Sequence, residues 1–339
     1  MSATDIQVAP KGNGFSRRQA LKVVAAAVAV PAVVGGVRLI APQGRYYTWN
    51  GEALGAISSM TIWHPNADYA RQTLNRMLIE VARLDAVFSL FYGDSEITRL
   101  NREGAITGAS RDLVTVMEAS RAMGAASNGA FDPSVQALWD LYLRHFSSPL
   151  ADPAGPPQAE IDAARRLIGY QDIDIGARSV AFAQPGMTAT LNGIAQGYIT
   201  DRISDLLRNE GFEHVVIELG ETRVLGDSPE GGPWRIHLRD QQGATDRVME
   251  LSDSALAVSG GYGTTFDTTG NNHHLFDPST GRSANGLSDV VISAPRAMDA
   301  DALATAIYVA GEERAAAILA NYRGASALLT RHDGSTIRF

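Results

Sequence analysis

The sequence contains no cysteine among its 339 residues. This absence excludes disulfide bonds, zinc sites built on thiolates, thiol catalysis and the lipid-anchored cysteine of a lipoprotein. Any metal ion that the chain binds must therefore be held by oxygen atoms or by imidazole nitrogen atoms.

The sequence also lacks stretches rich in lysine and arginine, and its 37 acidic residues outnumber its 29 basic ones. A net charge of -8 and a pI of about 5.4 argue against a partner recognised through a phosphate backbone, so nucleic acid is not expected. We find no internal repeat. A hydrophobic fraction of 45% is ample for a packed core, and it indicates one large domain or two intimately packed lobes.

The N-terminal segment has the features of an export signal. Arg17 and Arg18 stand in a Ser-Arg-Arg-x-x-Leu-Lys pattern ahead of an alanine- and valine-rich run, which resembles the twin-arginine type that directs folded proteins across the bacterial inner membrane. The alternatives are a buried helix and a short membrane anchor, but the run 23–37 is shorter than the roughly 20 residues of a spanning helix. We therefore expect residues 1–45 to be an export signal and junction, and the mature protein to be periplasmic.

Residues 46–339 are expected to form a single α+β domain. Apolar residues at Leu74, Leu78, Val81, Leu84 and Phe88 recur at helical spacing and predict an amphipathic helix. Further helices are predicted near residues 113–123, 195–208, 299–309 and 311–321. Strands are predicted near residues 57–63, 214–219, 234–239, 255–259 and 289–294, and a strand pair is predicted at the C-terminal end. The proline-rich stretch 147–160 predicts a surface loop between two halves. This irregular order argues against a doubly wound sheet.

Two stretches with candidate chemistry also have simple structural interpretations. In "SLFYGDSEITRLN" (89–101), an aromatic pair precedes an Asp-Ser-Glu that is typical of a helix N-cap. In "GAFDPSVQALWDLY" (129–142), the Phe-Asp-Pro is typical of a turn into an apolar helix. Taken alone, each stretch favours the structural interpretation.

Two further stretches are suited to anions and cations. "TLNGIAQGYITD" (190–201) places Gly193 and Gly197 at a predicted helix start, where free N–H groups favour a phosphate, although this spacing is no dinucleotide fingerprint. "DADALATA" (299–306) places Asp301 and Thr305 on one face of a helix. Their oxygen atoms suit Mg²⁺, but an Asp near a helix start is more often a cap.

The stretch "HHLFDPSTG" (273–281) raises three alternatives: a metal site, the wall of a ligand pocket, or a polar strand end before a turn. A zinc pair is disfavoured, because adjacent residues of an extended segment point to opposite faces.

The order of these stretches, together with "SGGYGTTF" (259–266), resembles that of the ApbE family of FAD:protein FMN transferases. The resemblance extends from about residue 54 to the C-terminus. It implies an α+β flavin transferase fold with an FAD cleft between two packed lobes. It also implies Mg²⁺-dependent cleavage of the FAD diphosphate, in which FMN is attached through a phosphoester to a Thr or Ser of a target flavoprotein and AMP is released.

The resemblance assigns roles to individual positions. Asp301 and Thr305 match the family's metal-binding side chains, and Gly193 matches its main-chain carbonyl ligand. Asp301 is expected to accept the proton of the target hydroxyl as well, His274 is expected to serve in catalysis and in the flavin pocket, and His273 is expected to be incidental. The positions expected to contact FAD are Leu54, Phe91, Ala130, Phe131, Asp132, Thr190, Gln196, His274 and Phe276.

Two positions depart from the family pattern. Thr190 stands where the family usually has Asp, and Gln196 stands where it usually has Lys, so one carboxylate and one positive charge near the cofactor are missing. Two other functions therefore stay open. A periplasmic FAD carrier would keep only the aromatic pocket, whereas an FAD diphosphate hydrolase would also keep Asp301 and Thr305.

Exported members of the family without a lipoprotein cysteine include the NosX-type accessory proteins of nitrous-oxide respiration. These proteins flavinylate a membrane-bound electron-transfer protein. The twin-arginine pattern and the missing cysteine agree with this subgroup, which implies such a target and the twin-arginine export machinery as partners.

Overall fold

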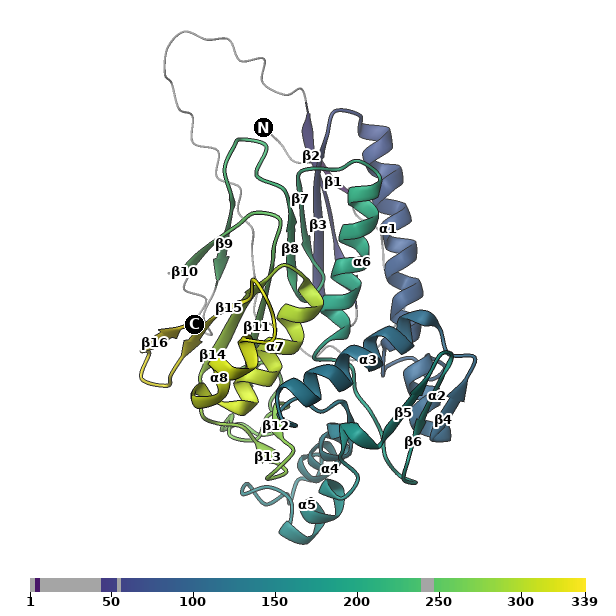
Figure 1. Cartoon of the computed structure of the whole chain (residues 1–339), viewed down its shortest axis with the longest axis vertical. Helices are drawn as coiled ribbons and strands as arrows, with labels where there is room; N and C mark the ends of the chain where they lie inside the picture. Colours follow the sequence, from purple (N-terminus) through teal and green to yellow (C-terminus); the bar gives the residue numbers. More distant parts are fainter. Residues whose placement is uncertain (1–3, 7–43, 54–55, 239–246) are drawn as a thin grey trace.

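The computed structural model describes residues 4–6, 44–53, 56–238 and 247–339 (Figure 1). Arg17, Arg18, the apolar run behind them and Leu54 lie outside the described residues, so these predictions stay predictions. Within the described part of the chain, no helix combines the length and the apolar character needed to cross a membrane.

A nine-stranded sheet forms the centre of the molecule, in the order β1-β2-β3-β7-β8-β11-β14-β15-β16. Only the β1–β2 pair is parallel among the pairs of this sheet, and the others are antiparallel. The predicted α+β class is therefore confirmed. The strands are β1 Thr4–Ile6, β2 Arg45–Ala53, β3 Ala56–His64, β7 Val215–Glu218, β8 Thr222–Leu225, β11 Ala255–Gly260, β14 Asp289–Ala294, β15 Ser326–Thr330 and β16 Thr336–Arg338.

Within the described residues, three small sheets accompany the central one. They are the β9–β10 pair (Trp234–Leu238, Arg247–Leu251), the β12–β13 pair (Phe276–Asp277, Arg282–Ser283), and β4-β6-β5 (Ala105–Thr107, Ser179–Phe182, Ile173–Gly176).

The helices follow the predicted hydrophobic spacing closely. They are α1 Ala67–Phe88, α2 Glu96–Glu103, α3 Arg111–Ala126, α4 Gln136–Phe146, α5 Gln158–Arg165, α6 Ala195–Asn209, α7 Ala297–Ala310 and α8 Glu312–Leu319, with 3₁₀ turns η1 Pro133–Val135, η2 Tyr170–Asp172 and η3 Gly261–Gly263. The predicted loop 147–160 is three residues too long. Pro157, with φ of -55°, occupies the N-cap of α5, so residues 158–160 form its first turn.

Apolar side chains fill both faces of the central sheet. On β14, Val290 and Ile292 belong to the large core that includes residues of α1, α6 and α7. Val291, between them, belongs to a second cluster that the β9–β10 pair covers with Trp234 and Ile236. This alternation follows from the two-residue period of a strand. The helical layer in Figure 1 therefore covers one face of the sheet.

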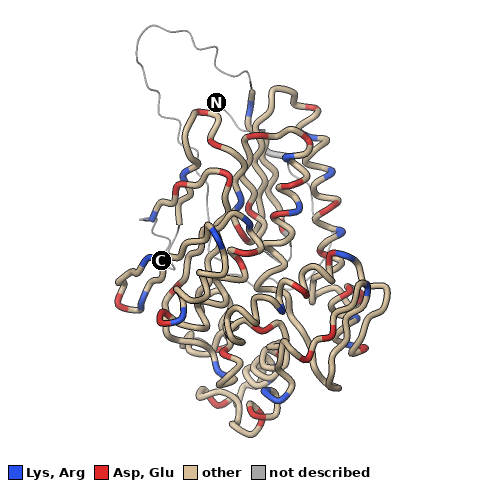
Figure 2. Tube along the Cα trace, viewed as in Figure 1, with Lys and Arg blue, Asp and Glu red and all other residues tan. Residues whose placement is uncertain are grey.

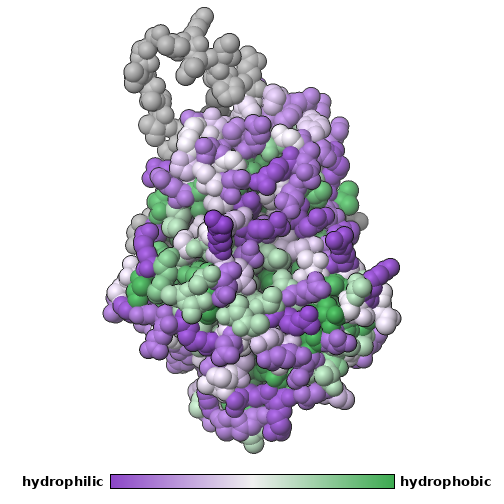
Figure 3. Space-filling view, viewed as in Figure 1, coloured by the Kyte–Doolittle hydropathy of each residue, from purple (hydrophilic) through white to green (hydrophobic). Residues whose placement is uncertain are grey.

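The surface of the described chain is mixed in character. Figure 2 shows acidic and basic residues interspersed along the described trace, in agreement with the moderate net charge. Figure 3 shows polar side chains over most of this face, with apolar patches around α7 and α8. Of these two helices, α7 carries the predicted metal-binding residues Asp301 and Thr305.

Candidate functional site

The site is built around the crossing of α6 and α7. The two helices contact each other at Gly197, where an added Cβ atom would lie 2.3 Å from the carbonyl oxygen of Ala297. Only glycine allows this close approach. The backbone N–H of Gly197 donates a 3.0 Å hydrogen bond to Oδ2 of Asp301, which is 5% exposed. The crossing therefore fixes the position of the Asp301 carboxylate, which the family resemblance implies is a metal ligand.

The three positions predicted to bind a metal ion lie close together. Thr305 follows Asp301 by one turn of α7, and Gly193 lies in the loop before α6. A Cβ atom on Gly193 would lie 2.9 Å from Oγ1 of Thr305 and 3.4 Å from Cε2 of Phe131. The predicted spacing of Asp301 and Thr305 on one helix face thus brings them to the Gly193 loop, beside an aromatic ring.

These residues fit a hard cation. A carboxylate, a hydroxyl and a main-chain carbonyl are oxygen donors of the kind that Mg²⁺ accepts, with phosphate and water completing its shell. Burial raises the pKa of Asp301 to about 7, against a lowering effect of the Gly197 hydrogen bond. The described residues contain no group of three or more His, Asp or Glu side chains that could share a metal ion.

Glu221 is a buried acidic residue of this region that the sequence analysis missed. It lies between β7 and β8 and is 8% exposed. Burial raises its pKa well above the usual range, and the charge of Asp301 raises it further. The pair therefore favours a single negative charge at neutral pH. The local signal in the sequence is a Gly-Glu pair directly after a buried strand, which alone predicts only a turn.

The loop 130–132 lines the same region. Ala130 and Phe131 are buried. Oδ1 of Asp132 accepts hydrogen bonds from the N–H and the hydroxyl of Ser134, at 2.8 and 2.5 Å, and Oδ2 accepts one from the Tyr170 N–H at 2.9 Å. The Asp132 carboxylate thus stabilises the loop.

Thr190 and Gln196 border the Gly193 loop on either side. The N–H of Thr190 donates a 2.7 Å hydrogen bond to the Pro133 carbonyl, which ties the two loops together. The side chain of Gln196 lies against Gly220, where a Cβ atom would be 2.5 Å from Cδ of Gln196. Gly220 has φ of +99°, so glycine serves both the turn and the packing.

The two adjacent histidines have different partners. Nδ1 of His273 accepts the Leu275 N–H at 3.2 Å, so its Nε2 carries the proton and donates to Asn285 Oδ1 at 3.2 Å. Nδ1 of His274 lies 3.1 Å from the Thr264 carbonyl, which can only accept, so Nδ1 carries the proton and Nε2 keeps its lone pair. Burial lowers the pKa of His274 to about 4. The His274 ring is therefore neutral at pH 7.

The remaining predicted aromatic positions have contrasting environments. Phe91 follows α1 and is 80% exposed, so its ring is open to a ligand or a partner. Phe276 is buried and packs on Tyr142 and Phe266, with ring centroids 4.8 and 5.8 Å apart. Their predicted contacts with FAD stay predictions.

Comparison with known proteins identifies the family. Residues 54–329 match the ApbE family. The chain belongs to the ApbE family. An FAD:protein FMN transferase of Vibrio cholerae is 31% identical over 254 residues, covering 72% of this chain and 74% of that protein. One of Treponema pallidum is 29% identical over 278 residues, covering 73% and 76%.

Solved structures of ApbE proteins share the fold of this ApbE-family chain. The ApbE protein of Thermotoga maritima has a TM-score of 0.74 at 28% identity, and the flavin transferase ApbE of Vibrio cholerae has 0.73 at 25%. Each comparison covers 87% of this chain and 97% of the other. The ApbE family, the α+β flavin transferase fold and the transferase class predicted from the ordered motifs are confirmed, whereas the FAD cleft between two lobes and the NosX-type subgroup stay predictions.

Proposed function

We propose that this chain is a Mg²⁺-dependent FAD:protein FMN transferase. It attaches FMN through a phosphoester to a Thr or Ser of a target flavoprotein and releases AMP. The observation that carries the proposal is the meeting of Gly193, Asp301 and Thr305 beside Phe131. Two relatives with the transferase name support the same activity.

Asp301, Thr305 and the main-chain carbonyl of Gly193 would hold the cation. When bound, Mg²⁺ neutralises charge on the FAD diphosphate and orients it, which is the main requirement of phosphoryl transfer. The Gly197 N–H occupies Oδ2 of Asp301, which leaves Oδ1 as the free carboxylate oxygen. Phe131 offers a flat apolar surface next to this group.

His274 would accept the proton of the attacking hydroxyl at Nε2. Its Nδ1–H is held by the Thr264 carbonyl, which fixes the ring and keeps the lone pair on Nε2. Asp301 is the alternative acceptor, through Oδ1. We favour His274, because its lone pair stays available while Asp301 holds the cation.

We further propose that the protein works in the periplasm on a membrane-bound electron-transfer flavoprotein, as an accessory factor of nitrous-oxide respiration. The support is the Arg17-Arg18 pattern with the mildly apolar run behind it, and the absence of a lipoprotein cysteine.

The test uses purified protein, FAD, Mg²⁺ and a soluble flavoprotein domain that carries an Asp-Gly-x-[Ser/Thr]-Gly-[Ala/Ser]-[Ser/Thr] acceptor segment. Denaturing gel fluorescence and intact mass report covalent FMN, and chromatography reports AMP. The variant is Asp301→Ala, and the matched control is Asp299→Ala, which removes a half-buried carboxylate from the first turn of the same helix.

A covalent adduct that disappears with EDTA and in Asp301→Ala, but persists in Asp299→Ala, is the expected result. Free FMN and AMP with no adduct would instead identify a hydrolase. Bound and unchanged FAD would identify a carrier. An adduct formed at the normal rate by Asp301→Ala would overturn the role of Asp301.

A further inference from the structure

The start of α7 is stabilised by a side chain from α6. Asp201 is 2% exposed, and its carboxylate accepts the N–H groups of Ala297 and Met298 at 2.9 and 3.0 Å. It also accepts Nε–H of Arg296 at 3.2 Å. The N-cap residue of α7 is Arg296, and it makes no capping hydrogen bond. Asp201 therefore supplies the acceptor that α7 lacks, at the end of the helix where negative charge is favoured.

The start of α6 is stabilised in the same way by α7. Its N-cap residue, Ile194, has no side-chain acceptor. The N–H of Gly197, in the first turn of α6, donates to Asp301. Each helix thus receives a carboxylate from the other: Asp201 from α6 and Asp301 from α7. The two contacts are one turn apart on each helix, and they fix the sliding and the rotation of α7 against α6.

Charge behind Asp201 strengthens the arrangement. Nε of Arg223 on β8 lies 3.9 Å from Oδ1 of Asp201, and the Arg223 side chain is only 7% exposed. Arg296 approaches from the solvent side with 47% of its side chain exposed. The two guanidinium groups thus hold the buried Asp201 carboxylate in its orientation.

We propose that Asp201 is a positioning residue for the metal site: through its contacts with Ala297 and Met298 it fixes the rotation of α7 that presents Asp301 and Thr305 to the Gly193 loop. The inference rests on the proposed function, because it concerns the cation that these residues would hold. Among the described residues, Asp201 makes its hydrogen bonds to Arg296, Ala297 and Met298 and none to the three positions that would hold the cation, so its effect passes through the helix.

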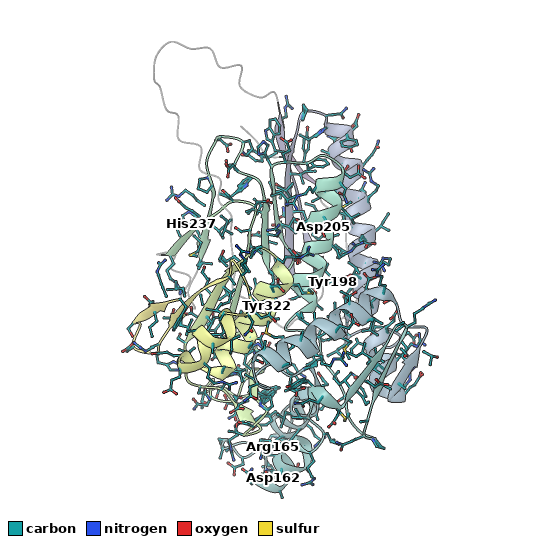
Figure 4. The ribbon with its side chains drawn as sticks, in the orientation of Figure 1. Asp162, Arg165, Tyr198, Asp205, His237 and Tyr322 are labelled. Atoms are coloured by element: carbon teal, nitrogen blue, oxygen red, sulfur yellow. The ribbon has the colours of Figure 1, made fainter. Side chains whose placement is uncertain are left out.

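The test is Asp201→Asn, with Asp205→Asn as the matched control. An amide keeps the shape of the side chain but offers one acceptor oxygen where the carboxylate offers two, so an N–H of α7 loses its partner. Asp205, labelled in Figure 4, lies one turn further along α6 and pairs with Arg296 at 3.6 Å without reaching the backbone of α7. The Asp205→Asn substitution therefore removes the same charge from the same helix as Asp201→Asn.

Two measurements separate positioning from general damage. Mn²⁺ binding to the FAD-free protein, followed by electron paramagnetic resonance, should weaken about tenfold in Asp201→Asn, the lower end of the range for supporting residues of metal sites. FAD affinity without metal should not change. Activity should return toward the wild-type level at saturating Mg²⁺, which a merely misfolded variant would not show. Asp205→Asn should match the wild type throughout.

Each other outcome has a distinct meaning. Equal Mn²⁺ affinity in Asp201→Asn and the wild type would overturn the positioning role while leaving the metal site intact. A wild-type protein that binds no Mn²⁺, or whose binding survives Asp301→Ala, would instead overturn the metal site itself. Should Asp201→Asn fail to fold, Asp201→Glu keeps the charge but displaces the carboxylate by one methylene group from the N–H groups of Ala297 and Met298, and a Mn²⁺ affinity equal to that of the wild type would then contradict the proposal.

Discussion

Gly193, in the loop before α6, lies against Thr305 of α7, and the space between them is too small for a Cβ atom on Gly193. A Cβ atom on Gly193 would lie 2.9 Å from the Thr305 hydroxyl oxygen. Real Cβ atoms do not approach so closely, so any larger residue must displace Thr305 or the loop. This contact joins two of the three positions proposed to bind the metal ion.

Gly193→Ala is therefore expected to weaken both the metal site and the fold. Overpacking of this kind costs about 1–3 kcal/mol in stability. We expect Mg²⁺ affinity to fall about tenfold or more, because the donors lose their geometry. Isothermal titration with Mg²⁺ and urea unfolding measure the two effects. The control is Gly286→Ala, where an added Cβ atom meets open space. Equal Mg²⁺ affinity in both variants would contradict the proposed site.

Asp301→Asn is expected to stabilise the metal-free protein at alkaline pH. The folded pKa of Asp301 is about 7, above the ordinary value of 3.8, so the stability that this carboxyl contributes is present below pH 3.8 and is lost as pH rises through 7. Asparagine has no charge to bury. At pH 8 in EDTA the variant should have a larger free energy of unfolding than the wild type, and at pH 4 the two values should converge.

Urea unfolding at both pH values measures this difference. Addition of Mg²⁺ at pH 8 should stabilise the wild type and leave Asp301→Asn unchanged, since binding to the folded state adds stability. If the variant is less stable than the wild type at pH 8 in EDTA, burial of the ionised Asp301 carboxylate does not destabilise the folded protein.

His274 is expected to make the protein sensitive to acid. Its folded pKa of about 4 lies below the ordinary 6.5, so the unfolded chain binds the proton more tightly. The stability from the neutral ring is complete above pH 6.5 and is lost as pH falls toward 4. Between pH 7 and 4.5 the loss is about 2–3 kcal/mol.

His274→Gln should remove this part of the pH dependence. The comparison is the change in unfolding free energy between pH 7 and 4.5, with His332→Gln, an exposed position, as the control. A wild-type slope retained by His274→Gln would assign the acid sensitivity to other groups.

Gln196→Lys is expected to tighten FAD binding. The family usually has Lys here, and the Gln196 side chain is held against Gly220 next to the Gly193 loop. One positive charge near the diphosphate should lower the dissociation constant about threefold to fivefold, the effect of a partly exposed ion pair. Added salt should reduce the gain. Fluorescence quenching of FAD measures it, and Gln196→Met is the neutral control. Equal tightening by Met and Lys would show that charge is not the cause.

Local signals in the sequence predicted much of the fold. The spacing of Leu74, Val81 and Leu84 predicted α1, and all three side chains are buried. Ser95 caps α2 as predicted, accepting the Thr98 N–H. These features depend on neighbours within a few residues, where helix and cap chemistry decides the structure.

The assembled site could not be predicted in the same way. Asp301 and Thr305 share a face because they are four residues apart, and the ordered motifs indicated their role. The burial of Glu221 beside Asp301 and the capping of α7 by Asp201 depend on segments that are distant in the sequence and meet only in the folded domain. Nothing near Asp201 in the sequence distinguishes it from the other acidic residues of its helix.

The pairing of β3 with β7 has a consequence for the synthesis of the chain. Ser59 on β3 and Glu218 on β7 are joined by a 2.7 Å hydrogen bond across a sequence separation of 159 residues. During translation, one edge of β3 has no partner until β7 leaves the ribosome, and the nascent chain carries an open strand edge for that time. Folding through such distant contacts is slow compared with that of local helical folds. A chaperone that covers this open strand edge would therefore increase the yield of folded protein without changing its final stability.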